Sequence, residues 1–544
     1  MSTQAWMQHL APGRRLAMVV ATAALGLLMA GCPDQGVDCG EGLTECAGAC
    51  VDASSDGQNC GGCGTTCAQA QACVEGSCQC QPGATLCGSQ CSVTASDPAN
   101  CGGCAGQGGQ VCAAGQVCEA GQCKVACDLT TSSRCGDACV NLRTDANHCG
   151  ACGQACGNAQ SCKAGACSYD IVAACFNTGQ VVGLQAGSDL KGPNVALGDR
   201  PQSLARMQDV LLVLDAATKL RQARLKDYVR LNEEVSTGSA PNHMLANDPF
   251  VYVINSTSNT LLTFSRQKEP QAQPVDGTRF PEGLGLASVA SLDFGANTNP
   301  FAMAQLGDQL WVSLYGNLLG DTSAGGKVAR VSLANPARPT VLEPAVELPT
   351  GAALQPFAGS SPIPGPAGLV VHRGSLYVTL NNIDPNTYNP GGPGLLAKIN
   401  PGTRAVSTVN LGPDCLNAGW AASAGNKLVV SCAGKATYDA SFNLVAVEKT
   451  GLVLLDEQDA VVATYSLACP QGSAGTCALP SAGRFSVVGN RVYLGDNNAG
   501  RLFVIEVSGN QLIERRGLGA GAQPAILACP AQGFSLVGDV VAIP

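Results

Sequence analysis

The sequence has few charged and few aromatic residues. Only 13% of its 544 residues are charged and 4% are aromatic, whereas it contains 67 glycines and 30 prolines. This balance argues against long surface helices and favours short strands joined by turns. Forty acidic residues against 31 basic ones give a formal charge of −9. Such an acidic chain is a poor match for nucleic acid or anionic lipid.

Histidine is also scarce, since only His148, His243 and His372 follow the first thirty residues. The chain contains no nucleophile elbow, HExxH motif, P-loop or dinucleotide fingerprint. No catalytic constellation emerges, so we predict no enzyme activity, no cofactor and no metal site.

The first residues have the layout of an export signal. Arg14 and Arg15 precede an apolar or small stretch at 16–30, and Gly31 and Cys32 follow it. A charged region, an apolar region and a small-residue cleavage site are typical of a signal peptide. The apolar stretch is too short for a comfortable transmembrane helix. The two arginines would also fit twin-arginine export, on weak evidence.

The run Leu28-Met29-Ala30-Gly31-Cys32 resembles the lipobox of bacterial lipoproteins. In that family the cysteine is lipidated and becomes the first mature residue. The resemblance implies a membrane anchor on Cys32 and a place in the cell envelope, at the outer membrane or cell surface. One residue departs from the pattern, because the family prefers Leu where Met29 stands. A cleaved secretory signal and an uncleaved anchor are the alternatives.

The 31 cysteines divide the chain. One is Cys32, twenty-four lie between Cys39 and Cys167, and six follow. The change near residue 170 is the strongest domain boundary in the sequence. We therefore predict these parts: a signal peptide at 1–31, a lipidated tether at 32–38, a cysteine-rich arm at 39–169 and a last domain at 170–544.

The arm contains three copies of one eight-cysteine unit, at 39–78, 80–123 and 127–167. Asp and Gly recur with the cysteines, as tight turns require. The recurring residues are Asp56, Asp97 and Asp145, then Gly61, Gly102 and Gly150, and finally Gly76, Gly121 and Gly165. Units this small need cross-links to fold. The CxxC spacings are compatible with zinc, but the export signal and the even count favour disulfides, with connectivity left open.

The third unit, from Cys135 through Cys149 and Cys152 to Tyr169, resembles the stigma-specific cysteine-rich family. That resemblance implies an extracellular module for binding or spacing, and no activity. His148 occupies the place of Asn59 and Asn100 in the other units. We interpret it as a turn residue rather than a metal ligand.

The last domain carries a looser repeat of about 54 residues. In each copy a Pro or small residue leads into an apolar run, and a loop leads into a second run. The copies begin near Pro201, Pro241, Pro300, Pro366, Ala418, Ala482 and Pro524. Four short strands at this spacing indicate a β-propeller blade. The predicted fold class is all-β, a seven-bladed β-propeller preceded by three small disulfide-rich, loop-rich repeats.

The two ends of this domain are expected to share one blade. The segment from Pro524 to Ile543 would supply the first two strands, and the segment that begins at Gly179 would supply the outer two. Stretches such as Phe250 to Phe264 resemble the YVTN-type propeller repeats of extracellular proteins. A pair of β-sandwiches is the structural alternative.

The six cysteines of the last domain can pair. Cys469 and Cys477 bracket a Gly-rich loop, and Cys415 and Cys432 flank a strand turn. The remaining pair, Cys175 and Cys529, would then close the ring across its seam.

Binding residues are expected on long loops, because loops on a rigid scaffold commonly carry function. Connections between blades, and those between a blade's second and third strands, share one face of a propeller, which we call the loop face. The long insertions at 267–299, 315–326, 334–365, 381–394 and 432–450 were assigned to it. The predicted ligand-facing residues are Tyr315, Asn317, Asn381, Asp384, Tyr388 and Tyr438. The alternative is that these loops bind nothing.

Two short runs of Asn and Asp, at 381–384 and 496–498, could offer oxygen ligands to calcium, but neither has EF-hand spacing. We interpret them as solvated turns.

Together these features predict an envelope lipoprotein that acts as a binding or adhesion module. Its partners would be the membrane, through Cys32, and a protein or glycan on the loop face. The alternatives are a propeller enzyme, such as a lactonase or quinone-dependent dehydrogenase, and a passive structural component of the envelope. An enzyme would need acidic or histidine groups that converge at the central channel.

Overall fold

Strands and turns build the described chain, which contains no α-helix. The computed structural model describes residues 39–40, 42–68, 71–113, 116–125, 132–135, 138–268, 283–316, 324–350, 364–384, 387, 389–469, 477–519, 521–530 and 536–543. These form two compact units, one of residues 171–182 with 194–543 and one of residues 39–170 with 183–193. No helix in this described part is long and apolar enough to cross a membrane.

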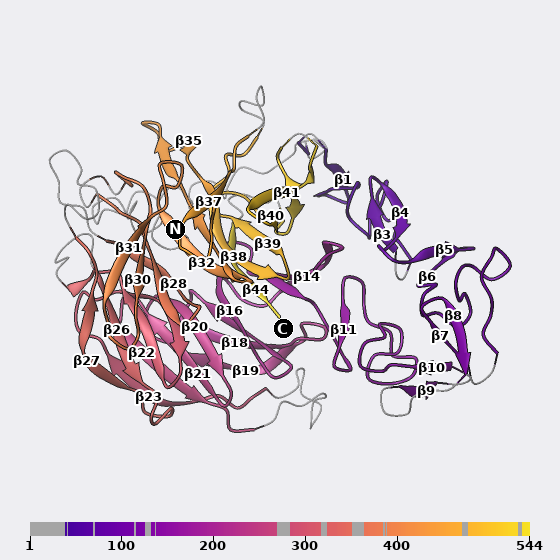
Figure 1. The fold of residues 1–544 in the computed structure, drawn as a ribbon, viewed down its shortest axis with the longest axis horizontal. Coiled ribbons are helices and arrows are strands. Elements are labelled where there is room, and N and C mark those ends of the chain that lie inside the picture. Colours follow the sequence, from indigo (N-terminus) through magenta and orange to yellow (C-terminus); the bar gives the residue numbers. More distant parts are fainter. Residues whose placement is uncertain are drawn as a thin grey trace, which may run out of the picture. The chain divides into compact units, whose positions relative to one another are not determined.

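Short hairpins form the cysteine-rich repeats (Figure 1, indigo to purple). The first repeat contains β1 (Thr44–Cys46) with β2 (Ala49–Val51), and β3 (Gln71–Val74) with β4 (Ser77–Cys80). The second contains β5 (Thr85–Cys87) with β6 (Gln90–Ser92), and β7 (Gln116–Glu119) with β8 (Gln122–Val125). The third contains β9 (Ser133–Cys135) with β10 (Ala138–Val140), and β11 (Ser161–Lys163) with β12 (Ala166–Ser168).

Disulfides link each repeat in one pattern. The first cysteine pairs with the third, the second with the fifth, the fourth with the seventh and the sixth with the eighth. In the first repeat these bonds are Cys39–Cys50, Cys46–Cys63, Cys60–Cys73 and Cys67–Cys78. The second repeat and the described bonds of the third follow the same order.

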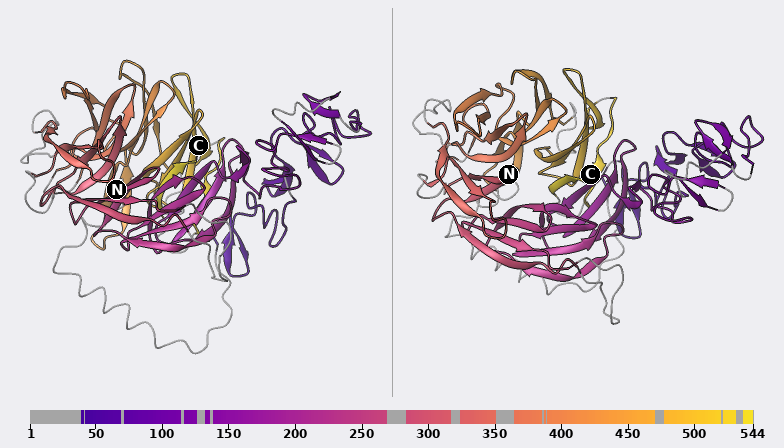
Figure 2. Two further views of the ribbon diagram at one scale, coloured as in Figure 1. Left: turned by 90° about the horizontal axis from the view of Figure 1, so that it is seen from below. Right: turned by 60° about the horizontal axis from the view of Figure 1, so that its bottom comes forward.

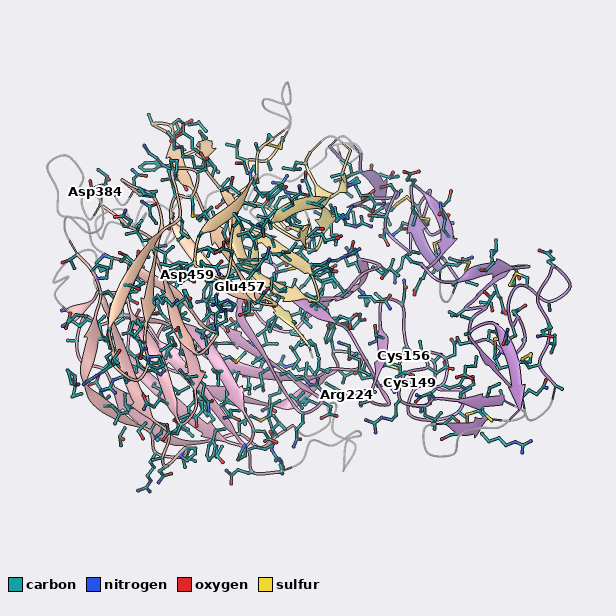
Figure 3. The ribbon with its side chains drawn as sticks, in the orientation of Figure 1. Cys149, Cys156, Arg224, Asp384, Glu457 and Asp459 are labelled. Atoms are coloured by element: carbon teal, nitrogen blue, oxygen red, sulfur yellow. A yellow bond between two sulfur atoms is a disulfide. The ribbon has the colours of Figure 1, made fainter. Side chains whose placement is uncertain are left out.

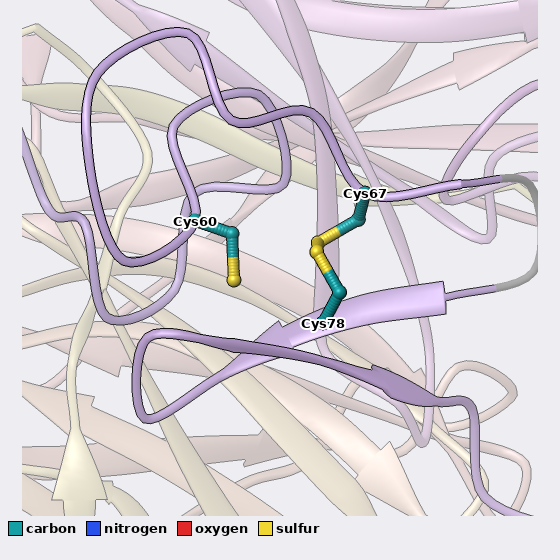
Figure 4. A group of neighbouring side chains, drawn as sticks. All are labelled: Cys60, Cys67 and Cys78. Carbon is teal, nitrogen blue, oxygen red and sulfur yellow. A yellow bond between two sulfur atoms is a disulfide. The ribbon is translucent and has the colours of Figure 1, made fainter.

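The fourth, sixth and eighth cysteines of each repeat lie close together. Figure 4 shows this group in the first repeat, where Cys60 lies beside the bonded Cys67 and Cys78. The three sulfur atoms lie within 4.8 Å of one another. Each is already part of a disulfide, so these groups are two adjoining cross-links rather than sets of free thiolates.

The repeated polar residues shape the turn around each CxxC. The Asp56 carboxylate accepts hydrogen bonds from the Gln58 N–H at 2.8 Å and from the Asn59 amide at 3.0 Å. Asn59 Oδ1 accepts the Gly64 N–H at 2.8 Å. His148 Nδ1 accepts the Gly153 N–H at 3.0 Å in the same way. The structure thus gives His148 the turn contact that asparagine makes in the first repeat.

The recurring glycines lie against one another. A Cβ on Gly150 would lie 2.4 Å from the Gly165 carbonyl oxygen, and Gly61 and Gly102 approach Gly76 and Gly121 in the same manner. Their φ angles are also positive, at +77° for Gly150. Both the turn and the close backbone approach therefore require glycine.

We expect Gly150→Ala to disrupt the third repeat and Gly153→Ala to be tolerated. Both glycines have similar positive φ angles, +77° and +75°, but nothing lies within 4 Å of a Cβ on Gly153. Gly153→Ala should cost only the roughly 1–2 kcal/mol of a left-handed alanine. Gly150→Ala adds a clash between backbone segments, and so should lower the yield of correctly paired cysteines. Disulfide mapping by mass spectrometry without reduction measures this yield, and equal yields would contradict the packing.

A seven-bladed β-propeller forms the rest of the chain (Figure 2). Each blade has a four-stranded antiparallel sheet, and its strands are given from the axis outward. Blade 1 contains β44 (Val537–Ala542), β13 (Ile171–Cys175), β14 (Gln180–Gln185) and β15 (Leu190–Ala196). Blade 2 contains β16 (Pro201–Met207), β17 (Val210–Asp215), β18 (Lys219–Arg224) and β19 (Arg230–Ser236). Blade 3 contains β20 (Pro241–Asn247), β21 (Phe250–Asn255), β22 (Thr260–Ser265) and β23 (Ala287–Asp293).

The other four blades repeat this order. Blade 4 contains β24 (Pro300–Leu306), β25 (Gln309–Leu314), β26 (Lys327–Ser332) and β27 (Thr340–Glu347). Blade 5 contains β28 (Pro366–His372), β29 (Ser375–Leu380), β30 (Leu395–Ile399) and β31 (Val406–Asn410). Blade 6 contains β32 (Ala418–Ala424), β33 (Lys427–Cys432), β36 (Gly451–Leu455) and β37 (Val461–Ser466). Blade 7 contains β38 (Ala482–Val488), β39 (Arg491–Asp496), β40 (Arg501–Ser508) and β41 (Gln511–Gly517), with the short β42 (Gln523–Pro524) and β43 (Ile526–Leu527) beside them.

Blade 1 is closed differently from the prediction. The carboxy-terminal segment supplies one strand, β44, and the segment that begins at Ile171 supplies three. The expected division of two and two was wrong, because Pro524 belongs to β42 beside β41 rather than to an inner strand. β13 pairs with β44 from Ile171↔Ala542 onward, and β44 contacts both β38 and β16. The inner strands therefore close a complete ring.

The apolar core lies between neighbouring blades. The second strand of each blade is buried on both faces, as the sequences VLLVLD, QLWVSL and SLYVTL predict. A polar contact repeats beside it. The Thr379 hydroxyl donates to the Gly419 carbonyl at 2.7 Å and accepts the Gly368 N–H at 2.7 Å, and the Gly368 carbonyl lies 3.3 Å from it. Because Gly419 belongs to the next inner strand, one hydroxyl links two blades.

Thr379→Val should lower the free energy of unfolding by about 2 kcal/mol, because it leaves the buried Gly368 N–H without an acceptor. Thr379→Ser keeps the hydroxyl and should cost about 1 kcal/mol for the lost methyl group. Urea unfolding measures both. An equal loss in the two variants would show that the hydroxyl does not link the blades.

Candidate functional site

Three of the five long insertions lie wholly between the second and third strands of a blade. They are 315–326, 381–394 and 432–450. The other two were assigned correctly only in part. Each contains an outer strand, β23 or β27. The part before that strand connects third to fourth strands on the opposite face, and the part after it connects two blades as predicted. β23 has the sequence ASVASLD and is largely exposed, so it carries little apolar signal.

The insertion in blade 6 folds into an extra hairpin. β34 (Lys435–Tyr438) pairs with β35 (Leu444–Glu448), and neither pairs with another described strand. Figure 1 shows β35 extending outward from the body of the propeller. We call residues 435–448 the blade 6 hairpin.

The tip of this hairpin is a fixed turn that presents an aromatic ring. Asp439 Oδ1 accepts the N–H groups of Ser441 and Asn443 at 2.8 and 2.9 Å, and Asp439 Oδ2 accepts the Asn443 amide at 3.0 Å. These hydrogen bonds lower the pKa of Asp439. Phe442 lies within the turn at φ +63°, and 66% of its surface is exposed. A bulky residue rarely adopts this conformation, and such strain is often found at functional sites.

The hairpin has one apolar and one polar face. The register pairs Tyr438 with Leu444 and Ala436 with Val447, so these four side chains share a face. Lys435 and Glu448 pair on the other face. Tyr438 is 39% exposed and Val445 is 52% exposed. Tyr438, Phe442 and Val445 are the most exposed large apolar residues of this hairpin.

Of the other predicted ligand-facing residues, Tyr315, Asn381 and Asp384 are buried. The Tyr315 ring packs against Phe301, with centroids 5.6 Å apart. The Asn381 amide donates to Asn417 Oδ1 and to the Ala418 carbonyl, both at 2.7 Å. Tyr315 also lies in an apolar cluster with Ala367 and Leu376 of blade 5. Asn381 links blade 5 to blade 6. Neither side chain faces solvent. Asn317 and Tyr388 lie outside the described residues.

The two Asn and Asp runs considered for calcium make hydrogen bonds within the protein. Asp496 is fully buried and accepts the Ser481 and Asn498 N–H groups at 3.1 and 2.9 Å. It also pairs with Arg501 at 2.6 Å. Burial raises the pKa of Asp496 despite this cation. In the first run, the Asp384 N–H donates to the Asn389 carbonyl at 3.0 Å.

A groove of about 450 Å³ is lined by residues of blades 5 and 6, among them Pro393, Pro413, Asp459 and Val461. Figure 3 shows Asp459 beside Glu457 and well apart from Asp384. Asp459 accepts hydrogen bonds from Tyr377 at 2.7 Å and from Lys398 at 2.6 Å. Burial acts to raise the pKa of Asp459, but these two bonds lower it overall. The carboxylate is thus held as one partner of an ion pair between two blades.

A third group of polar and aromatic side chains lies where the inner strands begin. The Arg484 guanidinium donates to the Gln202 and Asn242 carbonyls, both at 3.1 Å. It lies 4.1 Å from the centroid of the Trp420 ring and 3.7 Å from Asp539 Oδ2. His243 lies 5.8 Å from Trp420 between ring centroids. We call Gln202, Asn242, His243, Trp420, Arg484 and Asp539 the axial cluster.

Burial governs the ionisation of the axial cluster. It lowers the pKa of His243 to about 3, with a further contribution from the Arg484 charge, so His243 is neutral at pH 7. Burial lowers the pKa of Arg484 and raises that of Asp539. The sequence analysis missed this cluster, because β16, β20, β32, β38 and β44 each supply one or two of its members. Gln202 and Asn242 directly follow the prolines that begin β16 and β20, and this shared position was the signal that could have identified them.

The six cysteines of the propeller form Cys175–Cys529, Cys415–Cys432 and Cys469–Cys477. Cys175 lies in β13 and Cys529 follows blade 7, so their bond joins the two ends of the propeller. With the repeats, these bonds define the class: an exported protein that consists of a disulfide-rich amino-terminal region and a seven-bladed β-propeller.

Comparison with known proteins adds one local match. Residues 119–170 match the stigma-specific STIG1-like protein family, which covers the end of the second repeat and the third repeat. No curated protein matches the chain.

Solved structures share the propeller fold. A putative 6-phosphogluconolactonase from Bacteroides uniformis is 12% identical, with a TM-score of 0.46, over 69% of this chain and 98% of that one. AztD from Citrobacter koseri is 10% identical, with a TM-score of 0.36, over 68% and 97%. BamB from Moraxella catarrhalis is 12% identical, with a TM-score of 0.36, over 60% and 89%. Likeness at this level concerns the fold alone.

Proposed function

We propose that this protein is a lipid-anchored binding module of the bacterial cell envelope, and that the blade 6 hairpin is its main contact with a protein or glycan partner. The observation that carries the proposal is the exposed group of Tyr438, Phe442 and Val445 on a turn fixed by Asp439.

Exposed aromatic side chains on a rigid support are well suited to binding. Rings bury a large area at a small cost in side-chain entropy, and they commonly dominate the energy of an interface. The turn at Asp439 fixes the tip before binding, which reduces the ordering cost. The hairpin adds nothing to the blade 6 sheet, whose four strands pair without it. Binding therefore explains its exposed apolar face better than stability does.

Attachment to the membrane would come from lipidation of Cys32, which lies outside the described residues, at the outer membrane or cell surface. The YVTN-like repeats and the cysteine-rich arm are in keeping with an extracellular role. The enzyme alternative would use the axial cluster, but its one carboxylate, Asp539, already accepts the Leu204 and Val540 N–H groups.

The double variant Phe442→Ser and Val445→Ser tests the hairpin. Its binding to isolated cell envelopes should fall by about tenfold or more, as for the loss of an aromatic anchor. Its free energy of unfolding should change by less than about 0.5 kcal/mol, because both residues are exposed. Treating the envelopes with protease or with periodate separates a protein partner from a glycan.

Val289→Ser is the matched control, since Val289 is 37% exposed on the outer strand of blade 3. It should bind as the unchanged protein does. Undiminished binding by the hairpin variant, or an equal loss in the Val289 variant, would refute the proposed role.

A further inference from the structure

The axial cluster contains three buried polar atoms that have no hydrogen-bond partner. They are Gln202 Oε1, His243 Nδ1 and Arg484 Nε. Gln202 and Arg484 are only 1% and 4% exposed. A buried polar group without a partner costs about 1–3 kcal/mol, and native proteins seldom leave several together. Three in one cluster indicate that a further molecule completes their hydrogen bonds.

The side chains that carry these three atoms share neighbours within the axial cluster. Arg484 donates to the Gln202 backbone at 3.1 Å, and the Gln202 amide donates to Asn242 Oδ1 at 2.8 Å. His243 follows Asn242 in β20 and packs on Trp420, whose ring Arg484 also contacts. His243 and Trp420 are partly accessible to solvent even though they lie among inner strands. The cluster therefore borders solvent at these two rings.

The charge of Arg484 is only partly balanced. Asp539 Oδ2 lies 3.7 Å from the guanidinium, beyond hydrogen-bond distance, and accepts the Leu204 N–H at 2.8 Å. Asp539 Oδ1 accepts the Val540 N–H at 3.0 Å. The carboxylate is therefore committed to the backbone, and Arg484 binds two neutral carbonyls. A guanidinium pairs most strongly with an oxyanion, so an anion is the expected partner of Arg484 Nε.

Gln202 Oε1 sets a second requirement, because a carbonyl oxygen accepts a hydrogen bond and repels a bare anion. The molecule must carry a negative oxygen for Arg484 and a hydroxyl for Gln202. His243 Nδ1 can accept from or donate to either group, depending on its tautomer. Gln202 and Arg484 are almost fully buried, so the molecule must be small.

From this geometry we propose that the axial cluster binds a small hydroxy acid anion, with its carboxylate on Arg484 and its hydroxyl donating to Gln202. This site is independent of the blade 6 hairpin and of the partner proposed for it.

Glycolate and acetate make the direct test, because they differ by the hydroxyl. The purified mature protein would be titrated with each at constant pH and ionic strength, with sodium chloride as the reference salt. Trp420 supplies the signal through its fluorescence, and the thermal unfolding midpoint gives a second readout. We expect saturable binding of glycolate, about tenfold tighter than acetate, as one hydrogen bond to a buried acceptor would give. No saturable change, or equal affinity for the two anions, would overturn the proposal.

Two variants assign the contacts. Arg484→Lys should weaken both anions by about tenfold, because an ammonium lacks the planar donor set. Gln202→Leu should remove the preference for glycolate and leave acetate binding unchanged. Gln222→Leu is the control, because Gln222 is a buried glutamine in β18 that accepts the Leu284 N–H outside the cluster. It should keep the glycolate preference, and a preference that survives in Gln202→Leu would refute the assignment.

Discussion

Replacing both Cys175 and Cys529 with alanine is expected to reduce the stability of the propeller more than removing any other cross-link within it. The bond spans 354 residues of sequence, whereas Cys415–Cys432 spans 17. A cross-link restricts the unfolded chain in proportion to the logarithm of the loop that it closes. The two losses should therefore differ by about 2.5 kcal/mol, with the larger at roughly 5 kcal/mol.

The Cys415→Ala and Cys432→Ala protein is a close control. All four cysteines are at most 1% exposed, so each pair of substitutions leaves a similar space in the core. Urea unfolding of the two proteins gives the comparison. Equal losses of unfolding free energy in the two proteins would contradict the view that the Cys175–Cys529 bond holds the two ends of the propeller together.

The second large effect is expected from Arg484→Met. It removes two hydrogen bonds to carbonyls, the contact with Trp420 and the cation nearest to Asp539. Loss of one partner from a buried ion pair typically costs about 3–5 kcal/mol, because the other charge stays buried. Asp539 keeps its two backbone donors, which places the expected loss near the lower figure.

This loss should depend on pH. Burial already raises the pKa of Asp539 in the folded protein from its usual 3.8, and the Arg484 charge opposes that rise. Without Arg484 the folded-state pKa of Asp539 rises further. A carboxyl group with a raised folded pKa favours the folded state at low pH, and this contribution is lost as pH rises through the folded pKa. The Arg484→Met protein should therefore lie closest to the unchanged protein in acid and diverge from it toward pH 7.

Asp539→Asn in the same protein supplies the control, because asparagine has no charge to bury. The double variant should recover part of the stability lost at pH 7 and should lose the added pH dependence. A deficit that is independent of pH, or a double variant less stable than Arg484→Met alone at pH 7, would show that Asp539 is not the group left uncompensated.

The sequence predicted best where one residue type has one structural use. Cysteine spacing located the three repeats, and the glycines at Gly61, Gly102 and Gly150 proved to be places where two backbone segments touch. The apolar runs at 210–214 and 376–380 became buried second strands, because only strands buried on both faces are continuously apolar.

Prediction failed for exposed polar strands and for sites whose residues lie far apart in the sequence. Outer strands such as β23 and β27 are largely exposed, so they resemble loops in sequence. Pro524 resembles the prolines that begin other inner strands, so the predicted start of the last blade was wrong by one strand. Residues of the axial cluster are more than 300 positions apart at the extremes, from Gln202 to Asp539, and only the closed ring brings them together. The loop position of Tyr438 led to its prediction as a ligand-facing residue, and its side chain is exposed. Phe442 was not predicted, because nothing in the sequence marks a hairpin tip.

The central claim is that the protein is exported, carries a lipid and has its other cysteines in disulfides. The intact mass of the protein purified from its own membrane tests these three points at once. The account predicts a chain that begins at Cys32 and carries a diacylglyceryl group, with no thiol that reacts with an alkylating agent until a reductant is added. The other thirty of the 31 cysteines should then become reactive. A mass that includes residues 1–31, or many thiols that react without reduction, would contradict the account.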